Sequence, residues 1–174
     1  MATPDVSAEL RDLCARRDID RLLATYIRGL DRMMPELLTS VFHDDAYYDA
    51  GTYTGNAAGF VEFAMTFLGT MKRSHHHLGQ ALIEVSDTRA RGEVYFTAFH
   101  RVVIDGADTD LFIAGRYVDQ YADRGSGWKI SHRCLIVDWA RTEPAADAFV
   151  SGTPQLVLGA RGKDDFSNRR NWPA

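Results

Sequence analysis

DLFIAGRYVDQYADRGSGWKISHRCLIVDW, residues 110–139, is the stretch that decides the fold class of this chain. Two runs rich in Val, Ile, Phe and Tyr, at 110–122 and 128–139, flank the turn-forming residues DRGSG. Residues of this kind favour extended backbone, and the short polar interruption favours a tight connection. The stretch therefore predicts two antiparallel strands joined by a short loop.

Two similar runs precede it, at 75–86 and 92–105. The turn signal SDTRARG separates these two runs, and DGADTD separates the second of them from the run at 110–122. Four consecutive strands with short loops predict an antiparallel meander. Upstream, apolar residues recur every three or four positions in 10–30 and in 57–71, which is typical of amphipathic helices. The first of these runs predicts one helix, or two end to end with Asp18 capping the second, and ELLTSVF predicts a short helix at 36–42.

Helices grouped ahead of strands predict an α+β domain in which the helices cover one face of a curved, mainly antiparallel sheet. A length of 174 residues, with 45% hydrophobic residues, suits one domain rather than two. We place that domain at 1–140. Residues 141–174 lose the strand pattern and are expected to form an arm that packs on the domain or on a neighbouring subunit, or is partly disordered.

Composition excludes several classes of function. The 20 basic and 24 acidic residues are interleaved, so no basic stripe suited to a phosphate backbone is present, and nucleic acid is not an expected partner. The first ten residues lack the features of a signal peptide, and no apolar run approaches the ~18 residues of a membrane span, so we expect a cytoplasmic protein without membrane contact. Cys14 and Cys134 fit neither a disulfide framework nor a thiolate zinc site.

Three consecutive histidines stand in SHHHLGQ, residues 74–80. Alternate strand residues point to opposite faces, so His75 and His77 share a face with Ile83 and Val85, and His76 points the other way. The small and apolar neighbours of His77 predict the wall of a covered cavity, whereas His75 and His76 read as solvated residues at the strand start. Adjacent strand residues diverge and no further ligand motif is present, so no metal site is predicted.

Four segments together resemble a known family. They are IDRLLATYIRGLDRM (19–33), SVFHDDAYYDAGTYTG (40–55), SHHHLGQ and GRYVDQYADRGSGWKISHR (115–133). In order and spacing they are similar to the SnoaL-like branch of the nuclear transport factor 2-like superfamily, and within it to scytalone dehydratase, bile acid 7α-dehydratase and hexachlorocyclohexane dehydrochlorinase. The resemblance implies a cone-shaped α+β barrel with an apolar pocket at its open end.

The resemblance also implies a catalytic His–Asp dyad. Asp31 of GLDRM matches the aspartate at the end of the first long helix, and His77 of HHLGQ matches the histidine on the first strand of the meander. Tyr26, five positions before Asp31, matches a tyrosine of the bile acid dehydratase. Arg133 matches an arginine of the dehydrochlorinases, and His100 is a candidate for the second histidine of scytalone dehydratase.

The chemistry of these side chains supports the assignment. An aspartate that accepts a proton from one imidazole nitrogen fixes the tautomer, which leaves the other nitrogen as a base near neutral pH. Structural alternatives remain open: Asp31 caps a helix or pairs with Arg28 or Arg32, Arg133 pairs with Asp119 or Asp138, and Tyr26 and His100 are structural residues.

Many aromatic residues are available to line a large apolar pocket, so a hydroxylated polycyclic, steroid-like or aromatic substrate is predicted. The expected substrate-binding residues are His100, Arg133, Tyr48, Phe63, Phe96 and Arg116. The leading hypothesis is a cofactor-independent dehydratase that uses His77, Asp31 and Tyr26. The alternatives are an isomerase or polyketide cyclase with the same dyad, or a non-catalytic ligand-binding domain. The resemblance also implies a homo-oligomer joined through the outer face of the sheet, with a trimer favoured and a dimer possible.

Overall fold

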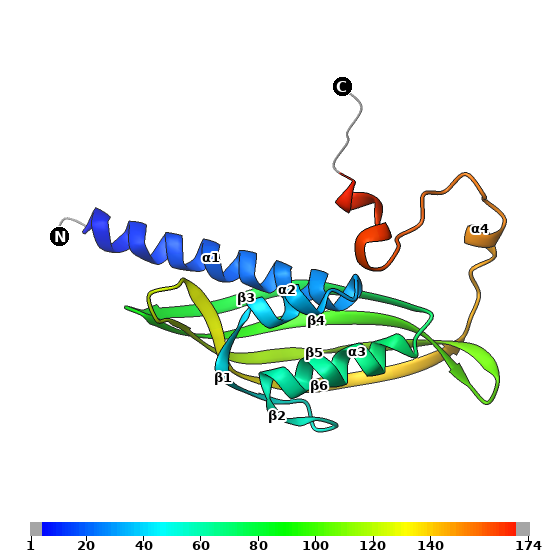
Figure 1. Ribbon diagram of the computed structural model, residues 1–174, viewed down its shortest axis with the longest axis horizontal. Coiled ribbons are helices and arrows are strands. Elements are labelled where there is room, and N and C mark those ends of the chain that lie inside the picture. Colours follow the sequence, from blue (N-terminus) through cyan, green and yellow to red (C-terminus); the bar gives the residue numbers. More distant parts are fainter. Residues whose placement is uncertain (1–4, 170–174) are drawn as a thin grey trace.

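The computed structural model describes residues 5–169, which form helices packed on one face of a sheet and a C-terminal arm (Figure 1). The elements in chain order are α1 (Val6–Asp31), α2 (Pro35–Ser40), β1 (Phe42–Asp49), β2 (Thr54–Asn56), α3 (Ala57–Gly69), β3 (Arg73–Ser86), β4 (Arg89–Ile104), β5 (Ala107–Asp123), β6 (Trp128–Pro144), α4 (Ala148–Ser151) and two 3-10 turns, Gly162–Asp164 and Phe166–Asn168. Within the described residues, no helix combines the length and apolar character needed to cross a membrane.

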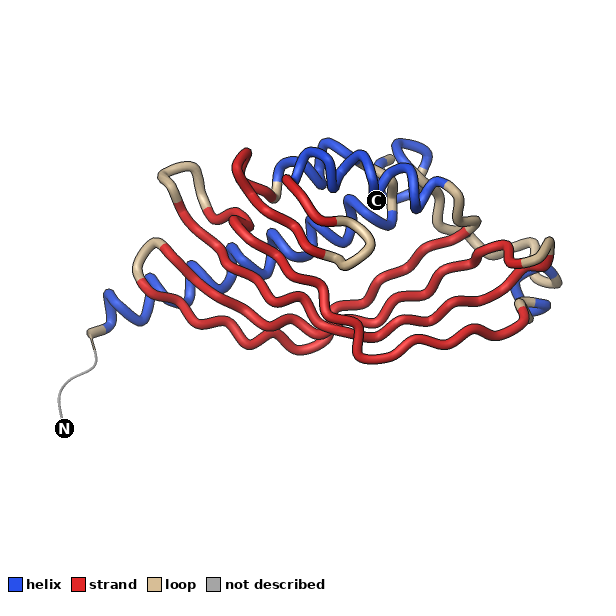
Figure 2. The backbone as a smooth tube through the Cα atoms, turned by 90° about the horizontal axis from the view of Figure 1, so that it is seen from below, coloured by secondary structure: helices blue, strands red, loops and turns tan. Residues whose placement is uncertain are grey.

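The six strands form one open, curved sheet in the order β2-β1-β6-β5-β4-β3. Strands β3 to β6 make the predicted antiparallel meander, and β1 joins its edge by pairing parallel to β6. Figure 2 shows the long strands side by side, bending part-way along their length. The predicted α+β class and the curved, mainly antiparallel sheet are confirmed, and the sheet does not close into a complete barrel.

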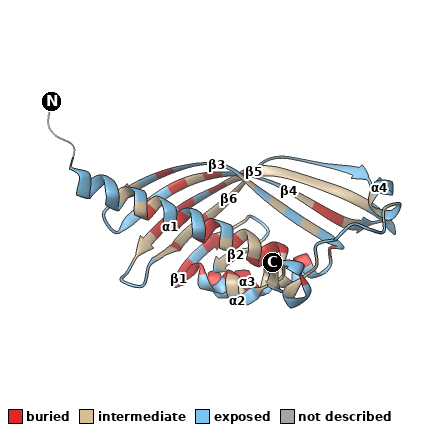
Figure 3. Ribbon diagram, turned by 90° about the horizontal axis from the view of Figure 1, so that it is seen from above, coloured by how far each residue is buried: buried red, intermediate tan, exposed pale blue. Residues whose placement is uncertain are grey.

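Helix α1 is continuous over 26 residues, because no glycine or proline interrupts its first six turns. The Asp5 carboxylate caps it by accepting from the amides of Ser7 and Ala8, and Asp18 is paired with Arg17 inside the helix. Of the two predicted alternatives, the single helix is confirmed, and the second helix that Asp18 would cap does not form. Figures 1 and 3 show α1 lying across the sheet, and its buried residues concentrate toward its C-terminal end, where Asp31 stands.

A β-bulge interrupts β3 and reverses its alternation. Leu78 pairs with Phe96 and Ala81 pairs with Val94, so three steps along β3 match two along β4. Before the bulge, His76 and Leu78 are the residues that face the helices. After it, the inward residues are Ile83 and Val85. We call the face toward the helices the inner face and the opposite one the outer face.

The core between the helices and the inner face is rich in aromatic rings. Tyr48 stacks on Phe60 with ring centroids 3.6 Å apart, and Phe96 stacks on Tyr117 at 4.6 Å. Tyr26 meets Tyr117 edge-on at 5.6 Å, which joins α1 to the sheet. Because such rings bury large apolar areas and their contacts are directional, this cluster fixes the end of α1 against β5 and β6.

Candidate functional site

Asp31, the last residue of α1, and His76 of β3 form a buried pair. The Asp31 Oδ1 atom lies 2.7 Å from His76 Nδ1, and Asp31 Oδ2 accepts the His76 backbone N–H at 2.9 Å. Their side chains are 6% and 8% exposed. A carboxylate at a helix C-terminus is disfavoured by the helix dipole, and its burial requires hydrogen-bond donors. His76 supplies two donors, which holds both the carboxylate and the ring in one orientation.

This geometry decides which nitrogen of His76 is free to react. An ionised carboxylate only accepts hydrogen bonds, so Nδ1 carries the proton that points at Asp31. The Nε2 atom of the neutral ring therefore presents a lone pair. A histidine oriented in this way is a general base whose imidazolium form is stabilised by the adjacent carboxylate.

The predicted pairing of Asp31 with His77 is wrong. His77 is exposed and lies on the outer face, in a depression that also contains Tyr95 and Trp139. The prediction extended the alternation of Ile83 and Val85 backward through Gly79 and Gln80, where the bulge shifts it by one residue. A one-residue shift exchanges the two faces of a strand. His76, which the sequence placed in solvent, therefore occupies the position assigned to His77.

The alternative partners of Asp31 are engaged elsewhere. Arg28 donates to Ser167 and Asn168, and Arg32 pairs with Asp165. Asp31 does not cap the start of a helix, because it ends α1. Among the described residues, the hydrogen bonds to the Asp31 carboxylate therefore come from His76.

His100 joins the pair on the inner face. It stands opposite Ser74 in the β3–β4 ladder, and its ring centroid is 5.1 Å from that of His76, in an edge-on arrangement. It is only 4% exposed, and its Nδ1 atom has no hydrogen-bond partner among the described residues. Burial, and secondarily the neighbouring His76, lowers the pKa of His100 to about 4. His100 is therefore neutral near pH 7 and has a ring N–H to donate.

Tyr26, Tyr48 and Arg133 form a second buried group. The hydroxyls of Tyr26 and Tyr48 are 3.0 Å apart, and the Arg133 guanidinium lies between the rings of Tyr26 and Tyr117, at 4.1 and 4.2 Å. Burial raises the pKa of both Tyr26 and Tyr48, so both hydroxyls stay protonated. Among the described residues, no hydrogen bond links this group to Asp31 or His76.

Arg133 adopts one of the structural alternatives left open by the sequence. Its Nε and Nη2 atoms donate to the Asp119 carboxylate at 2.7 and 2.6 Å, and Tyr121 donates to the same carboxylate at 2.5 Å. The remaining Arg133 Nη1 atom is buried without a partner in the described part of the chain. The sequence prediction did not include Asp119 among the site residues. The signal for it was the alternation of Tyr117, Asp119 and Tyr121 on β5, which places Asp119 opposite Arg133 in the β5–β6 ladder.

The other predicted substrate-binding residues are spread over both faces. Phe96 belongs to the core, and Phe63 is half-buried on α3, where it stacks with Tyr53 at 5.4 Å. Arg116 is on the outer face, held by Glu93 and Asp138, so its assignment to the site is wrong. The register on β5 explains this, because Tyr117 and Asp119 point inward and the even-numbered neighbours point outward.

Two depressions are prominent on the surface, with volumes of about 1340 and 390 Å³. The larger involves outward residues such as Leu82, Val118 and Gln120, and the smaller contains His77 and Trp139. The larger is lined by outward residues and also by Val85, Asp119 and Tyr121 of the inner face, and neither depression contains Asp31 or His76. The aromatic residues of the chain divide between the packed core, as for Tyr48 and Phe60, and the outer face, as for Tyr47 and Trp139.

Solved structures of several proteins share this fold. A putative scytalone dehydratase from Novosphingobium aromaticivorans is 22% identical, with a TM-score of 0.68 over 78% of this chain and 91% of its own. A type 2 hexachlorocyclohexane dehydrochlorinase, LinA, is 24% identical, with a TM-score of 0.70 over 80% and 94%. Kfla4162 from Kribbella flavida is 18% identical, with a TM-score of 0.68 over 75% and 95%. At these identities the likeness establishes a common fold.

No curated protein matches the chain at a significant level of sequence similarity. The model of the SnoaL-like domain family matches residues 11–134, which includes α1 from Arg11 onward, the pair of Asp31 and His76, and β6 as far as Cys134. The match covers well over half of the chain and agrees with the cone-like arrangement of helices on a curved sheet. The chain therefore belongs to the SnoaL-like domain family.

Proposed function

We propose that this protein is a cofactor-independent lyase, specifically a dehydratase that eliminates water from a hydroxylated polycyclic, steroid-like or aromatic substrate. The observation that carries the proposal is the buried pair in which Asp31 holds both the ring and the backbone amide of His76. The base is His76 rather than the predicted His77. A carboxylate at the C-terminal end of a helix is energetically unfavourable because of the helix dipole, and the fold alone does not require it.

The reaction follows from the protonation states of the site. His76 Nε2 takes a proton from a substrate carbon next to an electron-withdrawing group, and the C–H electron pair forms the new double bond. The C–O bond on the neighbouring carbon breaks, and the departing hydroxide takes up the proton that His76 Nε2 removed, so that water leaves and the neutral imidazole is restored. Asp31 stabilises the positive charge that appears on the imidazole, as expected for an oriented acid–base pair.

His100 is suited to assist this step. Because it is neutral near pH 7, its N–H donates to the departing oxygen, or to the oxygen of an enolate, without adding a second cation beside His76. A preorganised donor of this kind contributes about 3 kcal/mol to transition-state stabilisation. Tyr26 remains a candidate polar assistant, although its hydroxyl is directed at Tyr48.

The similar structures support an elimination. One is described as a putative scytalone dehydratase and another as a hexachlorocyclohexane dehydrochlorinase, and both names denote removal of a small molecule across a carbon–carbon bond. The aromatic residues around the end of α1 favour an apolar substrate body over a sugar or a phosphate ester.

The test compares two histidines of one strand. The purified protein is incubated with hydroxylated polycyclic ketones, and products are followed by mass spectrometry. Loss of one water identifies a dehydratase, whereas a changed spectrum at unchanged mass identifies an isomerase or a cyclase with the same dyad. His76→Ala and Asp31→Asn should each lower the rate by about 100-fold or more, and His77→Ala should leave it close to that of the wild type.

Circular dichroism of the three variants checks that the fold is retained. Full activity of His76→Ala, or loss of activity in His77→Ala alone, would show that the dyad is assigned to the wrong residue. Binding of these ketones without turnover would favour the non-catalytic alternative.

A further inference from the structure

The C-terminal arm returns to the end of α1 and is attached there by specific contacts. The Gly162 amide donates to the carbonyl of Arg32, the residue directly after Asp31. Arg32 Nη1 donates to the Ala160 carbonyl at 3.0 Å and to Asp165 Oδ2 at 3.2 Å. The arm therefore meets α1 next to the aspartate of the proposed dyad.

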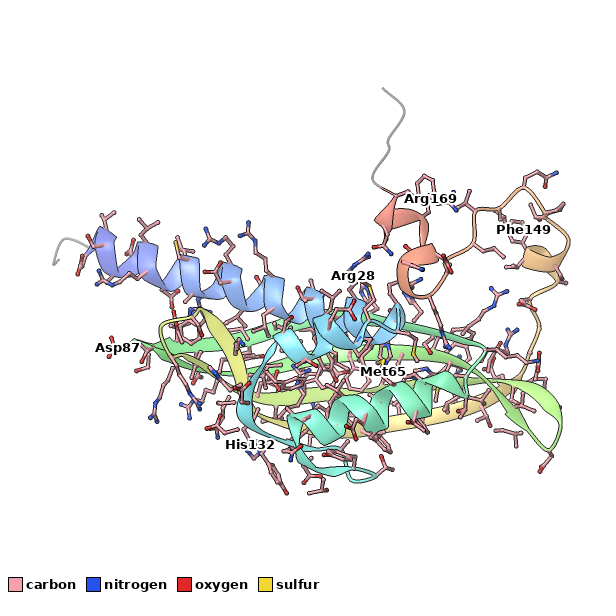
Figure 4. All side chains as sticks on the ribbon, viewed as in Figure 1. Arg28, Met65, Asp87, His132, Phe149 and Arg169 are labelled. Carbon is pink, nitrogen blue, oxygen red and sulfur yellow. The ribbon has the colours of Figure 1, made fainter. Side chains whose placement is uncertain are left out.

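A second set of contacts attaches the end of the arm. Arg28 donates to Ser167 Oγ at 3.0 Å and to Asn168 Oδ1 at 2.7 Å, and Asn168 Nδ2 donates back to the Gly162 carbonyl at 2.7 Å. Figure 4 labels Arg28 at the junction between α1 and the arm. Arg28 of α1 and Arg32, directly after α1, thus hold the arm, while Arg161 within the arm donates to Met71 instead.

Arg161 reaches the strand ends that carry the site histidines. Its Nη2 atom donates to the Met71 carbonyl at 2.9 Å, in the connection between α3 and β3. Three residues further on, Ser74 pairs with His100, and His76 follows. The positive charge of Arg161 also contributes to the lowered pKa of His100, with burial and His76 as larger causes and Asp31 opposing them. The guanidinium is therefore bonded to the connection that leads into β3, three residues before Ser74 and five before His76.

Arg161, like Arg28, has no carboxylate partner among the described residues, unlike three other arginines near the site. Arg32, Arg101 and Arg133 each pair with a carboxylate. Among the described residues, the Arg161 guanidinium has one hydrogen bond, to a backbone carbonyl, and no carboxylate within ion-pair distance. A half-buried guanidinium without a countercharge, beside a neutral histidine and a base, is suited to bind an anion.

We propose that Arg161 is a substrate-binding residue that receives a negatively charged oxygen of the substrate, either a carboxylate or the enolate oxygen formed when His76 removes a proton. The inference rests on the proposed function, because it assigns the cation of the same site. It places a specificity-determining residue in the arm, outside residues 11–134 that the family model matches. In the enolate case, the electron pair released from the C–H bond moves to the carbonyl oxygen, which Arg161 binds, and returns to expel hydroxide.

The first test measures binding of three ligands with the same apolar body to the full chain. They are 2-naphthoate, a carboxylate; 2-naphthol, an enolate analogue; and 2-methylnaphthalene, which has no oxygen. Arg161→Gln keeps a donor for the Met71 carbonyl but removes the charge, and should weaken binding of naphthoate or naphthol about tenfold or more. Arg161→Lys should restore part of that affinity, and methylnaphthalene should bind all variants alike.

The two oxygen ligands separate the two sources of charge. A loss confined to naphthoate identifies a carboxylate on the substrate, and a loss that includes naphthol identifies enolate binding. Equal affinity of Arg161→Gln and the wild type for both ligands overturns the proposal, as does absence of binding to the wild type. Arg28→Gln is the matched control, since it removes an arginine that holds the arm and faces Ser167 and Asn168 instead.

The second test follows the titration of His100 by nuclear magnetic resonance with labelled histidine. A cation disfavours protonation of a neighbouring imidazole, so Arg161→Gln should raise the pKa of His100 and Arg161→Lys should leave it near the wild-type value. The groups facing His100 in this comparison are His76, Asp31 and Arg161. An equal rise in Arg28→Gln would assign the effect to displacement of the arm and would contradict the role of the Arg161 charge.

These measurements are independent of turnover. If naphthoate or naphthol binding depends on Arg161 but no ketone is dehydrated, the proposed lyase activity fails and the anion-binding role stands. If dehydration depends on His76 and Asp31 but is unchanged in Arg161→Gln, the lyase activity stands and the role of Arg161 fails.

Discussion

His100 is the residue whose protonation most directly links the stability of this fold to pH. Its pKa is lowered from 6.5 to about 4 by burial and by His76. Between these values the unfolded chain binds a proton at His100 that the folded chain does not, so the contribution of His100 to stability falls as the pH decreases from 6.5 toward 4 and is constant above 6.5. At about 1.36 kcal/mol per unit, the loss amounts to about 3 kcal/mol.

His100→Gln should remove most of this pH dependence, because a neutral amide has nothing to titrate. The measurement is urea denaturation of the wild type and the variant at several pH values between 4 and 7.5. The difference in unfolding free energy between pH 4.5 and pH 7 should be larger for the wild type. Identical pH profiles would show that folding does not lower the pKa of His100.

The Arg133–Asp119 pair makes a second prediction at the scale of residues. Both side chains are fully buried, so removing one partner leaves an uncompensated charge in the core. Asp119→Leu should lower the free energy of unfolding by about 3–5 kcal/mol, and the double variant with Arg133→Met should recover a large part of that loss. Denaturant titration measures both effects.

An exposed pair supplies the comparison. Glu84→Gln breaks the ion pair with Arg91 at the surface and should change stability by less than about 1 kcal/mol. If Asp119→Leu is as mild as Glu84→Gln, the Arg133 guanidinium is able to find another partner or water in the variant.

At the scale of elements, the limit of the sequence prediction lies in the bulge of β3. The strand and its partners were predicted correctly, since apolar runs and turn residues are local signals. The face of each histidine depends on one extra residue at Gly79–Gln80, and no local signal in LGQA fixes where the alternation changes. Asp31 was correctly placed at the end of the long helix, because the end of a helix is predicted without knowing how the strands pair. The prediction therefore found one member of the pair and missed the other by one residue.

Gly115 marks a second bulge, between β5 and β6, and tests how tightly these irregularities are packed. A Cβ atom there would lie 2.0 Å from the Ile136 carbonyl oxygen and 3.1 Å from a carbon of the Phe96 ring. Backbone cannot move aside as a flexible side chain does, so Gly115→Ala should destabilise the protein by about 1–3 kcal/mol or more. Thermal or chemical denaturation provides the value.

Gly79→Ala in the β3 bulge is the matched control. Its Cβ atom would meet the Tyr95 Cβ at 3.4 Å, an ordinary contact. The substitution should therefore be tolerated, and a Gly115→Ala protein as stable as Gly79→Ala would mean that the β5–β6 bulge is free to rearrange.

The arm is a separate element, and one carboxylate makes several of the contacts that hold it in place. Asp165 accepts from the Ser167 hydroxyl and amide, the Ala160 amide and Arg32, and these donors, the Ser167 hydroxyl first, hold its pKa well below the usual value. Attachment is therefore complete above the ordinary pKa of about 3.8 and weakens as the pH falls below it. Asp165→Asn should release the arm at neutral pH and speed tryptic cleavage after Arg161 and Lys163, measured by mass spectrometry.

Asp164, the preceding residue, provides the comparison, because its carboxylate has no hydrogen bond or ion pair within residues 5–169. Asp164→Asn removes the same charge at an exposed neighbouring position and should leave the cleavage rate near that of the wild type. Equal acceleration in both variants would attribute the effect to net charge rather than to the contacts of Asp165.

At the scale of the whole molecule, local sequence patterns predicted the architecture correctly. Three helices followed by a meander can only bury their apolar faces by packing the helices on one side of the sheet, and that is the observed arrangement. The return of the arm to α1 was not predicted in detail, because its contacts are single polar hydrogen bonds between residues more than 120 positions apart, as between Arg32 and Asp165.

The outer face of the sheet is unusually apolar for a surface. Leu82, Tyr95, Val118 and Trp139 are 41–66% exposed, and they surround the charged group of Arg116, Glu93 and Asp138. Exposed apolar side chains gathered on one face, with charged residues among them, are typical of protein interfaces. We therefore propose that the protein is a homo-oligomer through this face, with a trimer favoured over a dimer.

Substitutions on the two sides of the molecule test this assembly. Trp139→Lys places a charge in the proposed interface and should shift the protein to monomers, because a buried unpaired charge opposes association. Leu13→Lys alters an equally exposed apolar residue on α1, at 62%, and should leave the assembly intact. Light scattering coupled to gel filtration, at several protein concentrations, gives the mass of each species. A monomeric wild type, or dissociation caused by Leu13→Lys and not by Trp139→Lys, would place the interface elsewhere or exclude it.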